Sequence, residues 1–342
     1  MKYRLIENIV HLKTKRDCLT PLGMGAGLIF LMLSRVADSL YWMSRYMERT
    51  DGILRMLKIN YASSQDDVQE FSWLPVLKIF TFLKRKDAEA MAHNTRAVLQ
   101  FMVIGRDNPN SVLNIVTMAR ENGRSVQDHI TKEMWQCLND FYHTMRDEHL
   151  ERLLQKEDPI TVLDNLLKKG LLYFGTTDVT MARGEGNSFI NIGKYLERAI
   201  QSTDILDIKF SNLNYEVDKI TDTTYWKYLL MSISGYELYL KTYRSGFEAK
   251  NVVGQIVLKE EFPRSVIYSV NRLQRYFERL KNDGNAAAFN QIDFMIGRLK
   301  SKVKFSTSDS IFEEGLHHFL TDTKKGLFEI GNALSQQYFA YS

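Results

Sequence analysis

Hydrophobic positions recur with helical spacing over two long segments of the chain. Steps of four and three residues place the apolar side chains on one face, as in a long helix packed against others. We expect Ser34 to cap the first of these helices. Its apolar positions are Val36, Leu40, Met43, Met47, Thr50, Leu54, Leu57 and Tyr61. Those of the second helix are Phe189, Ile192, Leu196, Ala199, Thr203, Leu206 and Phe210.

Other segments show the same period and are separated by turns rich in glycine and asparagine. No run of short alternating strands occurs, and the whole chain has only five prolines, which favours uninterrupted helices. The pattern predicts an all-α fold, a bundle of about ten helices. Besides the two long ones, we expect helices over residues 87–103, 110–127, 131–154, 161–173, 224–245, 264–281, 286–303 and 309–339.

Two short phrases occur twice, at nearly the same interval. Arg45-Tyr-Met-Glu-Arg49 returns about 150 residues later as Lys194-Tyr-Leu-Glu-Arg198, and Pro109-Asn-Ser-Val112 returns as Pro263-Arg-Ser-Val266. Because both phrases return after nearly the same number of residues, we predict an internal duplication around a pseudo-two-fold axis. We expect one domain over 32–342 with halves of about 32–180 and 181–342, and an N-terminal extension over 1–31 that lies outside it.

Composition narrows the class of protein. Hydrophobic residues make up 44% and charged residues 25%, which is typical of a globular chain, and the net charge of +4 does not call for a nucleic-acid partner. Two distant cysteines favour free thiols in a reducing compartment. No segment has the roughly 18 apolar residues of a membrane span. We therefore expect a cytoplasmic protein that contacts neither nucleic acid nor membrane.

The repeated charged phrase is the main candidate site. Residues three and four apart share a helix face, so Asp38, Trp42, Arg45 and Arg49 form one stripe. Lys194 and Arg198 are aligned in the same way on the second helix, with Asn191 in place of the tryptophan. Glu48 and Glu197 each follow an apolar seam position, which places them at the edge of the core.

Two interpretations of these residues stay open. The glutamates and arginines could pair across helices and fix their register. Alternatively, two arginine-bearing helices could meet and leave a cleft whose guanidinium groups bind a carboxylate or phosphate. A third arginine-rich stretch has the same two interpretations, a solvated helix or a part of the site, and contains Arg106, Arg120 and Arg124.

Motifs for metal or catalytic chemistry are absent. Seven histidines form no metal signature, and Glu314-x-x-His317 is only one half of a di-iron bundle motif. The sequence has no G-x-S-x-G, H-E-x-x-H or phosphate-binding loop. We expect no metal and no cofactor, and the catalytic residues, if the protein is an enzyme, are unknown.

Several segments in one order resemble the bacterial alpha-E family, named for an alpha-helical domain with an ER motif. They are the stretch Met32–Arg49, the stretch Arg106–Val112, Ala119–Ser125 with Trp135, Glu197–Ala199 with Asp204 and Asp207, and Phe262–Val266. The resemblance covers about residues 32–340. It makes Arg45, Glu48, Arg49, Glu197 and Arg198 the signature residues, with Lys194 where an arginine is common.

The resemblance also implies a cellular setting. Members of the family are typically encoded beside a circularly permuted ATP-grasp ligase, and often beside a transglutaminase-like protease. This implies a pathway that makes and trims amide bonds, with both proteins as candidate partners.

Three functions follow as hypotheses. The leading one is an accessory, non-catalytic protein that binds the ligase, or an anionic small molecule or peptide-like substrate, at the paired ER helices. The alternative is an enzyme of amide-bond synthesis or modification that uses Glu48 and Glu197 as acid and base. The third is a structural role in a homo-oligomer.

Overall fold

The computed structural model confirms the all-α prediction. Helices dominate the described part of the chain, and no strand occurs in it. The predicted extension over 1–31 lies mostly outside that part. The residues that the structure describes are 26–66, 72–156, 158–215, 223–244, 246–282 and 285–339.

The first half of the chain contains two long helices with shorter ones between them. In order they are α2 (Ala26–Ser63), α3 (Leu74–Phe80), α4 (Arg85–Met91), α5 (Thr95–Val103), α6 (Val112–Ser125), the 3-10 turn η1 (Gln127–His129), α7 (Lys132–Met145), α8 (Glu148–Lys156) and α9 (Pro159–Thr180).

The second half begins with a third long helix, α10. Its elements are α10 (Glu185–Ser211), α11 (Thr223–Ser232), α12 (Tyr236–Thr242), α13 (Ala249–Val253), the π-helical segment η3 (Gly254–Leu258), α14 (Val266–Phe277), the 3-10 turn η4 (Glu278–Leu280), α15 (Ala286–Lys304), α16 (Ser308–Glu314) and α17 (Leu316–Tyr338).

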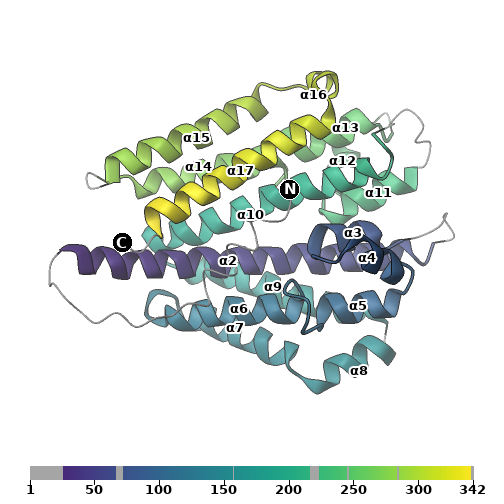
Figure 1. Ribbon diagram of the computed structural model, residues 1–342, viewed down its shortest axis with the longest axis horizontal. Helices are drawn as coiled ribbons and strands as arrows, with labels where there is room; N and C mark the ends of the chain where they lie inside the picture. Colours follow the sequence, from purple (N-terminus) through teal and green to yellow (C-terminus); the bar gives the residue numbers. More distant parts are fainter. Residues whose placement is uncertain are drawn as a thin grey trace.

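The longer helices pack as two groups of four. The first group is a ring in which each helix contacts the next and the last contacts the first, in the order α2, α6, α7 and α9. The second group is a ring of the same kind, in the order α10, α14, α15 and α17. The two groups meet where α2 packs along α10. Figure 1 shows α6, α7 and α9 on one side of this pair and α14, α15 and α17 on the other. The predicted duplication would place corresponding helices in this way, and it stays a prediction.

The central position of α2 and α10 explains their burial. The predicted seam positions from Leu40 to Leu57 and from Phe189 to Phe210 are buried, while Val36 and Tyr61 at the ends of the first seam are half-buried. The opposite faces are covered as well, and Tyr41 and Glu48 are 0% exposed. Polar side chains on α2 and α10 therefore need partners inside the protein.

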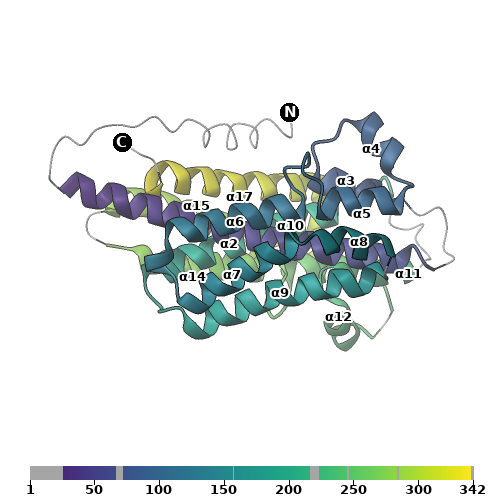
Figure 2. The ribbon, with the colours of Figure 1, turned by 90° about the horizontal axis from the view of Figure 1, so that it is seen from below.

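These two helices run parallel to each other and approach very closely. Gly193 lies against the backbone of Tyr41, Glu197 contacts Arg45, and Gly52 lies against Gln201, so residue numbers rise together along the pair. A Cβ on Gly193 would come within 2.4 Å of the Tyr41 carbonyl oxygen. Figure 2, which turns the view by 90°, also shows α2 and α10 in the middle of the bundle. Glycine at this position sets the distance between the helices.

The prediction of about ten helices was too low, because short breaks divide several of them. The described residues contain sixteen α-helices. The segment 309–339 breaks at Gly315, which has a φ of 95°, and 224–245 breaks where Ser234 has a φ of 57°. Segment 87–103 breaks before Asn94, whose side chain caps α5. Segment 131–154 breaks where Asp147 accepts a hydrogen bond from the His149 backbone.

Two boundary predictions were also wrong. Ser34 does not cap a helix, because α2 already begins at Ala26. The helix expected over 161–173 is longer, since α9 continues to Thr180. Within the described ranges, no helix combines the length and the apolarity that crossing a bilayer requires.

Candidate functional site

Glu197 of α10 accepts hydrogen bonds from two arginines of α2. Arg45 donates from Nε to Oε2 at 2.8 Å, and Arg49 donates from Nε to Oε1 at 2.6 Å. A further bond joins Nη2 of Arg49 to Oε2 at 3.2 Å. Because Arg45 and Arg49 are one helical turn apart, both reach the same carboxylate. Glu197 is therefore fully ion-paired inside the protein.

Glu48 of α2 makes the reciprocal contact with α10. Arg198 binds it through two parallel hydrogen bonds, Nε to Oε1 at 2.7 Å and Nη2 to Oε2 at 2.8 Å. Arg264, just before α14, adds a contact of 3.4 Å and also binds Asp51, which in turn pairs with Arg55 at 3.0 Å. We call these eight residues the arginine–glutamate cluster: Arg45, Glu48, Arg49, Asp51, Arg55, Glu197, Arg198 and Arg264.

The two loops that carry the second repeated phrase border the cluster. Nη1 of Arg49 donates to Oδ1 of Asn110 at 3.4 Å, and Nη1 of Arg198 donates to the Pro263 carbonyl at 3.3 Å. Ser111, directly after Asn110, and Ser265, two residues after Pro263, each cap the following helix by accepting a backbone N–H. Each copy of the Pro-x-Ser phrase thus starts a helix and places polar atoms beside an arginine.

The charges within the cluster determine how its carboxylates ionise. Burial alone would raise the pKa of Glu197, but Arg49 and Arg45 outweigh it and lower that pKa to about 2. For Asp51 too, Arg264 and Arg55 outweigh burial and lower the pKa. A carboxylate held ionised by two arginines is a poor proton donor or acceptor near neutral pH. Glu48 is bound by Arg198 and Arg264, so the ion-pair geometry argues against the acid–base hypothesis for both glutamates.

Arg45 is enclosed by aromatic rings as well as by its ion pair. Its guanidinium lies 4.6 Å from the centre of the Trp42 ring, and Nη1 donates to the Tyr41 hydroxyl at 3.0 Å. Burial raises the pKa of Tyr41, so its hydroxyl stays protonated. Asp38, the first residue of the predicted stripe, is half-buried and lies one helical turn before Trp42. The stripe on α2 is real, and its guanidinium groups converge on Glu197 instead of bordering an open cleft.

Lys194 occupies the position on α10 that corresponds to Arg45, yet it makes different contacts. Its ammonium lies 4.8 Å from the Tyr195 ring centre and 5.6 Å from that of Phe174. Among the described residues, no carboxylate lies within ion-pair distance of it, and Glu48 is bound by arginines instead. Burial, together with Arg198, lowers the pKa of Lys194 to about 8. The two repeated phrases therefore form unequal sites.

We expect Lys194→Met to increase stability at neutral pH. The depressed pKa means that the folded state disfavours the charged amine, so the penalty is complete below about pH 8 and disappears toward the ordinary lysine pKa of about 10.4. The substitution should raise the free energy of unfolding at pH 7 by about 1 kcal/mol or more. Urea unfolding of both proteins from pH 7 to 10 should show the difference shrinking as the pH rises. The exposed Lys86→Met is the control, and a difference that does not change with pH would contradict the interpretation.

The three arginines of the third arginine-rich stretch form no hydrogen bond or ion pair with the cluster in the described structure. Arg106 is exposed in the loop before α6. Arg120 donates to Asn139 of α7 at 3.0 Å and pairs with Glu121, which also binds Arg124. These contacts fit the interpretation of a solvated helix face. We therefore do not retain Arg106, Arg120 and Arg124 as members of the site.

Sequence reasoning missed three members of the cluster, Asp51, Arg55 and Arg264. Asp51 and Arg55 are four residues apart on α2, and Asp51 lies one turn after Glu48, so helical spacing contains a signal for them. Arg264 had been noted only as part of the repeated Pro-x-Ser phrase. Its ion pair with Asp51 depends on the packing of α14 and could not be read from spacing.

The half-motif Glu314-x-x-His317 does not form a unit. His317 lies 2.7 Å from Asp207 and 2.8 Å from the Tyr215 hydroxyl, which ties α17 to the end of α10. His318 instead comes near Glu314, and with Asp322 these residues form an exposed group that could hold a metal ion. Lys302 already contacts both of its carboxylates, at 3.1 and 3.4 Å. We do not assign a metal to this group.

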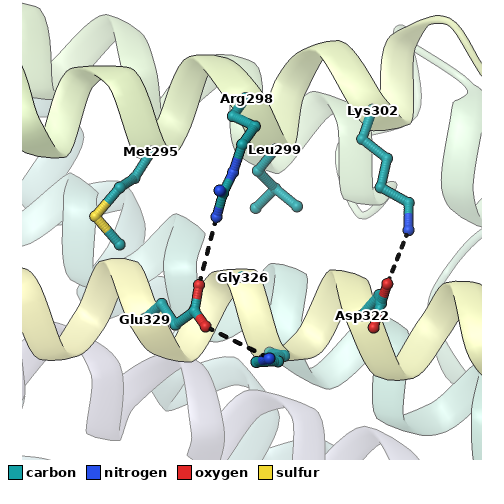
Figure 3. Close-up of a pocket in the computed structure, with 8 residues that line it drawn as sticks. Met295, Arg298, Leu299, Lys302, Asp322, Gly326 and Glu329 are labelled. Atoms are coloured by element: carbon teal, nitrogen blue, oxygen red, sulfur yellow. Dashed lines mark hydrogen bonds and ion pairs between the residues drawn. The ribbon is translucent and has the colours of Figure 1, made fainter.

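A surface groove of about 250 Å³ lies between α15 and α17, away from the cluster. Figure 3 shows Arg298 and Lys302 extending from α15 toward Glu329 and Asp322 of α17. The pairs are 3.6 and 3.4 Å apart. The third lining cation, Lys325, lies 4.0 Å from Glu329, so every cation of the groove has a carboxylate partner and the groove holds the two helices together through their own charges.

Comparisons with known proteins agree with the all-α fold. The chain is 23% identical over 305 residues to uncharacterized protein Mb2597 of Mycobacterium bovis and to uncharacterized protein Rv2567 of Mycobacterium tuberculosis. Each alignment covers 82% of this chain but 34% of the relative, so the chain spans about a third of the length of these proteins. No solved structure matches it. A family model for Alpha-E, "a predicted alpha-helical domain with a conserved ER motif", matches residues 32–339, and the chain therefore belongs to the Alpha-E family.

Proposed function

We propose that this protein is a non-catalytic accessory protein of a cytoplasmic ATP-grasp amide ligase, and that it binds the acidic, peptide-like substrate of that ligase at the arginine–glutamate cluster. The observation that carries the proposal is an excess of arginine in the cluster. It contains five arginines and three carboxylates.

The order of the ion pairs places the unbalanced charge at the ends of two chains. One runs from Arg45 through Glu197 to Arg49. The other begins at Arg198, passes through Glu48, Arg264 and Asp51, and ends at Arg55. Each chain begins and ends on an arginine, so each has one positive charge that its own carboxylates do not neutralise. An anion from outside would complete the charge balance.

The arginines that could meet such an anion are partly open to solvent. The side chains of Arg49 and Arg198 are 19% and 13% exposed, whereas those of Glu197 and Glu48 are 3% and 0% exposed. An acidic ligand would therefore contact guanidinium groups without meeting the buried carboxylates. Arginine suits this role because its planar group binds carboxylates through two parallel hydrogen bonds.

Two further considerations support a partner-dependent role. The carboxylates of the cluster are held by arginines, which leaves them unsuited to acid–base chemistry. In the mycobacterial relatives the matched segment is about a third of a longer chain, so the domain occurs there together with other parts. The resemblance to alpha-E proteins suggests the ligase, and also the transglutaminase-like protease, as candidate partners.

Binding of acidic peptides tests the proposal. Triglutamate should raise the midpoint of thermal unfolding, and triglutamine, which lacks the charges, should leave it unchanged, since a ligand of the folded state stabilises by mass action. Arg49→Gln should weaken triglutamate binding about tenfold. Arg124→Gln is the control, because Arg124 pairs with Glu121 on the exposed side of α6. Equal responses to the two peptides would exclude acidic-peptide recognition.

Copurification with the neighbouring ATP-grasp ligase tests the partnership separately. We expect association at micromolar concentration and a change in ligase turnover when this protein is added. Absence of both effects would contradict the partnership, whatever the peptide experiment shows.

A further inference from the structure

A cavity of about 260 Å³ lies between α2, α9 and α11. Arg55, the last member of the second ion-pair chain, borders it. The cavity is therefore next to one of the two unbalanced positive charges of the cluster, on the side away from Arg198 and Glu48. Its border joins the C-terminal part of α2 to the middle of α9.

Positive charge dominates one side of this cavity. The cations on its border are Arg55, Lys58 and Lys168, and the one carboxylate among its lining residues is Asp164. Lys58 pairs with Asp164 at 2.6 Å, which leaves the other two cations without a carboxylate in the cavity. Among the described residues Lys168 forms no ion pair, and it is exposed. The cavity border thus carries one cation without an ion pair in the described structure, Lys168, and a second, Arg55, whose partner Asp51 is not among the lining residues.

The guanidinium of Arg55 is only partly used by the protein. Nη2 binds both oxygens of Asp51, at 3.0 and 3.3 Å, and Asp51 is shared with Arg264. Nε of Arg55 is buried and has no hydrogen-bond partner among the described residues. Because Asp51 engages only Nη2, and the side chain is 19% exposed, the guanidinium keeps further donors for a carboxylate that enters the cavity.

The rest of the border is apolar. Ile59, Leu167, Leu171 and Met231 contribute to it, and Leu171 is 55% exposed although it is a large hydrophobic residue. The groove between α15 and α17 differs, because each of its three cations lies within ion-pair distance of Asp322 or Glu329. A cavity that is cationic on one side and apolar on the other is complementary to a carboxylate attached to a hydrophobic group.

We propose that this cavity binds a small carboxylate carried on an apolar group, of the size of one acylated amino acid. The volume is below the roughly 300–1,000 Å³ of sites for drug-sized ligands, which limits the occupant to this size. Arg55 and Lys168 hold the carboxylate, and the leucine and isoleucine side chains contact the apolar group. This site goes beyond the proposed function and does not require the ligase.

Isothermal titration calorimetry with three probes tests the proposal. N-acetyl-L-leucine should bind, N-acetyl-L-leucinamide should bind at least about tenfold more weakly because it lacks the charge, and acetate should bind as weakly because it lacks the apolar group. Equal binding of N-acetyl-L-leucine and its amide, or no binding of either, would overturn the assignment.

Variants locate the binding. Lys168→Gln should weaken N-acetyl-L-leucine binding at least about threefold, and Arg55→Gln about tenfold or more. Lys169→Gln is the matched control, since Lys169 is the next residue of α9 and does not border the cavity. Binding unchanged in Lys168→Gln, an exposed position at which folding is not at risk, would also overturn the proposal. Triglutamate binding should be the same in Lys168→Gln as in the wild type, which separates this site from the cluster.

Discussion

Replacement of Glu197 by glutamine should lower the free energy of unfolding by about 3–5 kcal/mol, because it leaves two buried or half-buried arginines without their carboxylate. Arg45 is the more affected, because its side chain is 9% exposed and pairs with no other carboxylate of the described residues. Against a total stability of roughly 5–15 kcal/mol, this is a large loss. Urea unfolding at pH 7 measures it.

The pH dependence of the same variant provides a second measurement. With a folded-state pKa of about 2, Glu197 contributes its full stabilisation above its ordinary pKa of about 4.3 and loses it as the pH falls toward 2. The difference between the wild type and Glu197→Gln should therefore narrow across that range. A difference that stays constant down to pH 2 would contradict the assigned ion pairs.

Glu121→Gln is the matched control for this experiment. Glu121 also binds two arginines, Arg120 and Arg124, but its side chain is 44% exposed. Surface ion pairs contribute about 0–1 kcal/mol, so this variant should remain close to the wild type. A similar loss in both variants would mean that burial is not the reason for the effect.

Gly193→Ala should cost about 2–3 kcal/mol, although alanine favours helices over glycine by up to about 1 kcal/mol. The new methyl group would meet the Tyr41 carbonyl oxygen at 2.4 Å, and backbone cannot move aside as a side chain can. The helices would have to separate, which would also lengthen the contacts of Glu197. Urea unfolding measures the loss of stability, and the acid limb of the pH profile should show a raised pKa of Glu197.

Gly175→Ala is the control that measures the higher helix propensity of alanine without a steric clash. Gly175 lies inside α9, and nothing lies within 4 Å of a Cβ built on it. This variant should be more stable than the wild type by up to about 1 kcal/mol. If Gly193→Ala behaved in the same way, α2 and α10 could not be as close as described.

The sequence predicted the central helices well because hydrophobic spacing reports directly on burial. The seam of α10 is buried from Phe189 to Phe210. Short elements escaped prediction, since the seven residues of α3 and the five of α13 are too few to show a period. The break at Gly315 was missed because the apolar pattern continues on both sides of it.

Only part of the candidate site was predicted, because helical spacing shows which residues share a face but not which helix that face meets. Spacing placed Arg45 and Arg49 on one face, and both reach Glu197. Glu197 was expected at the edge of the core, but it is fully buried between α2 and α10. Residue spacing could not predict that the arginines bind the glutamate of the other helix, because this contact depends on the parallel direction and the register of α2 and α10. The contribution of Arg264 depends in the same way on a loop 216 residues from Glu48.

The reciprocal pairing has a consequence for how the chain acquires its structure. The bonds from Arg45 to Glu197 and from Arg198 to Glu48 join residues 152 and 150 positions apart. During synthesis, the first half emerges with Glu48, Arg45 and Arg49 before any of the charged residues with which they pair exists. Closing such long loops is slow compared with forming local contacts. The N-terminal group of four helices must therefore wait for the C-terminal group to neutralise its central charges, which makes each half dependent on the other for completion.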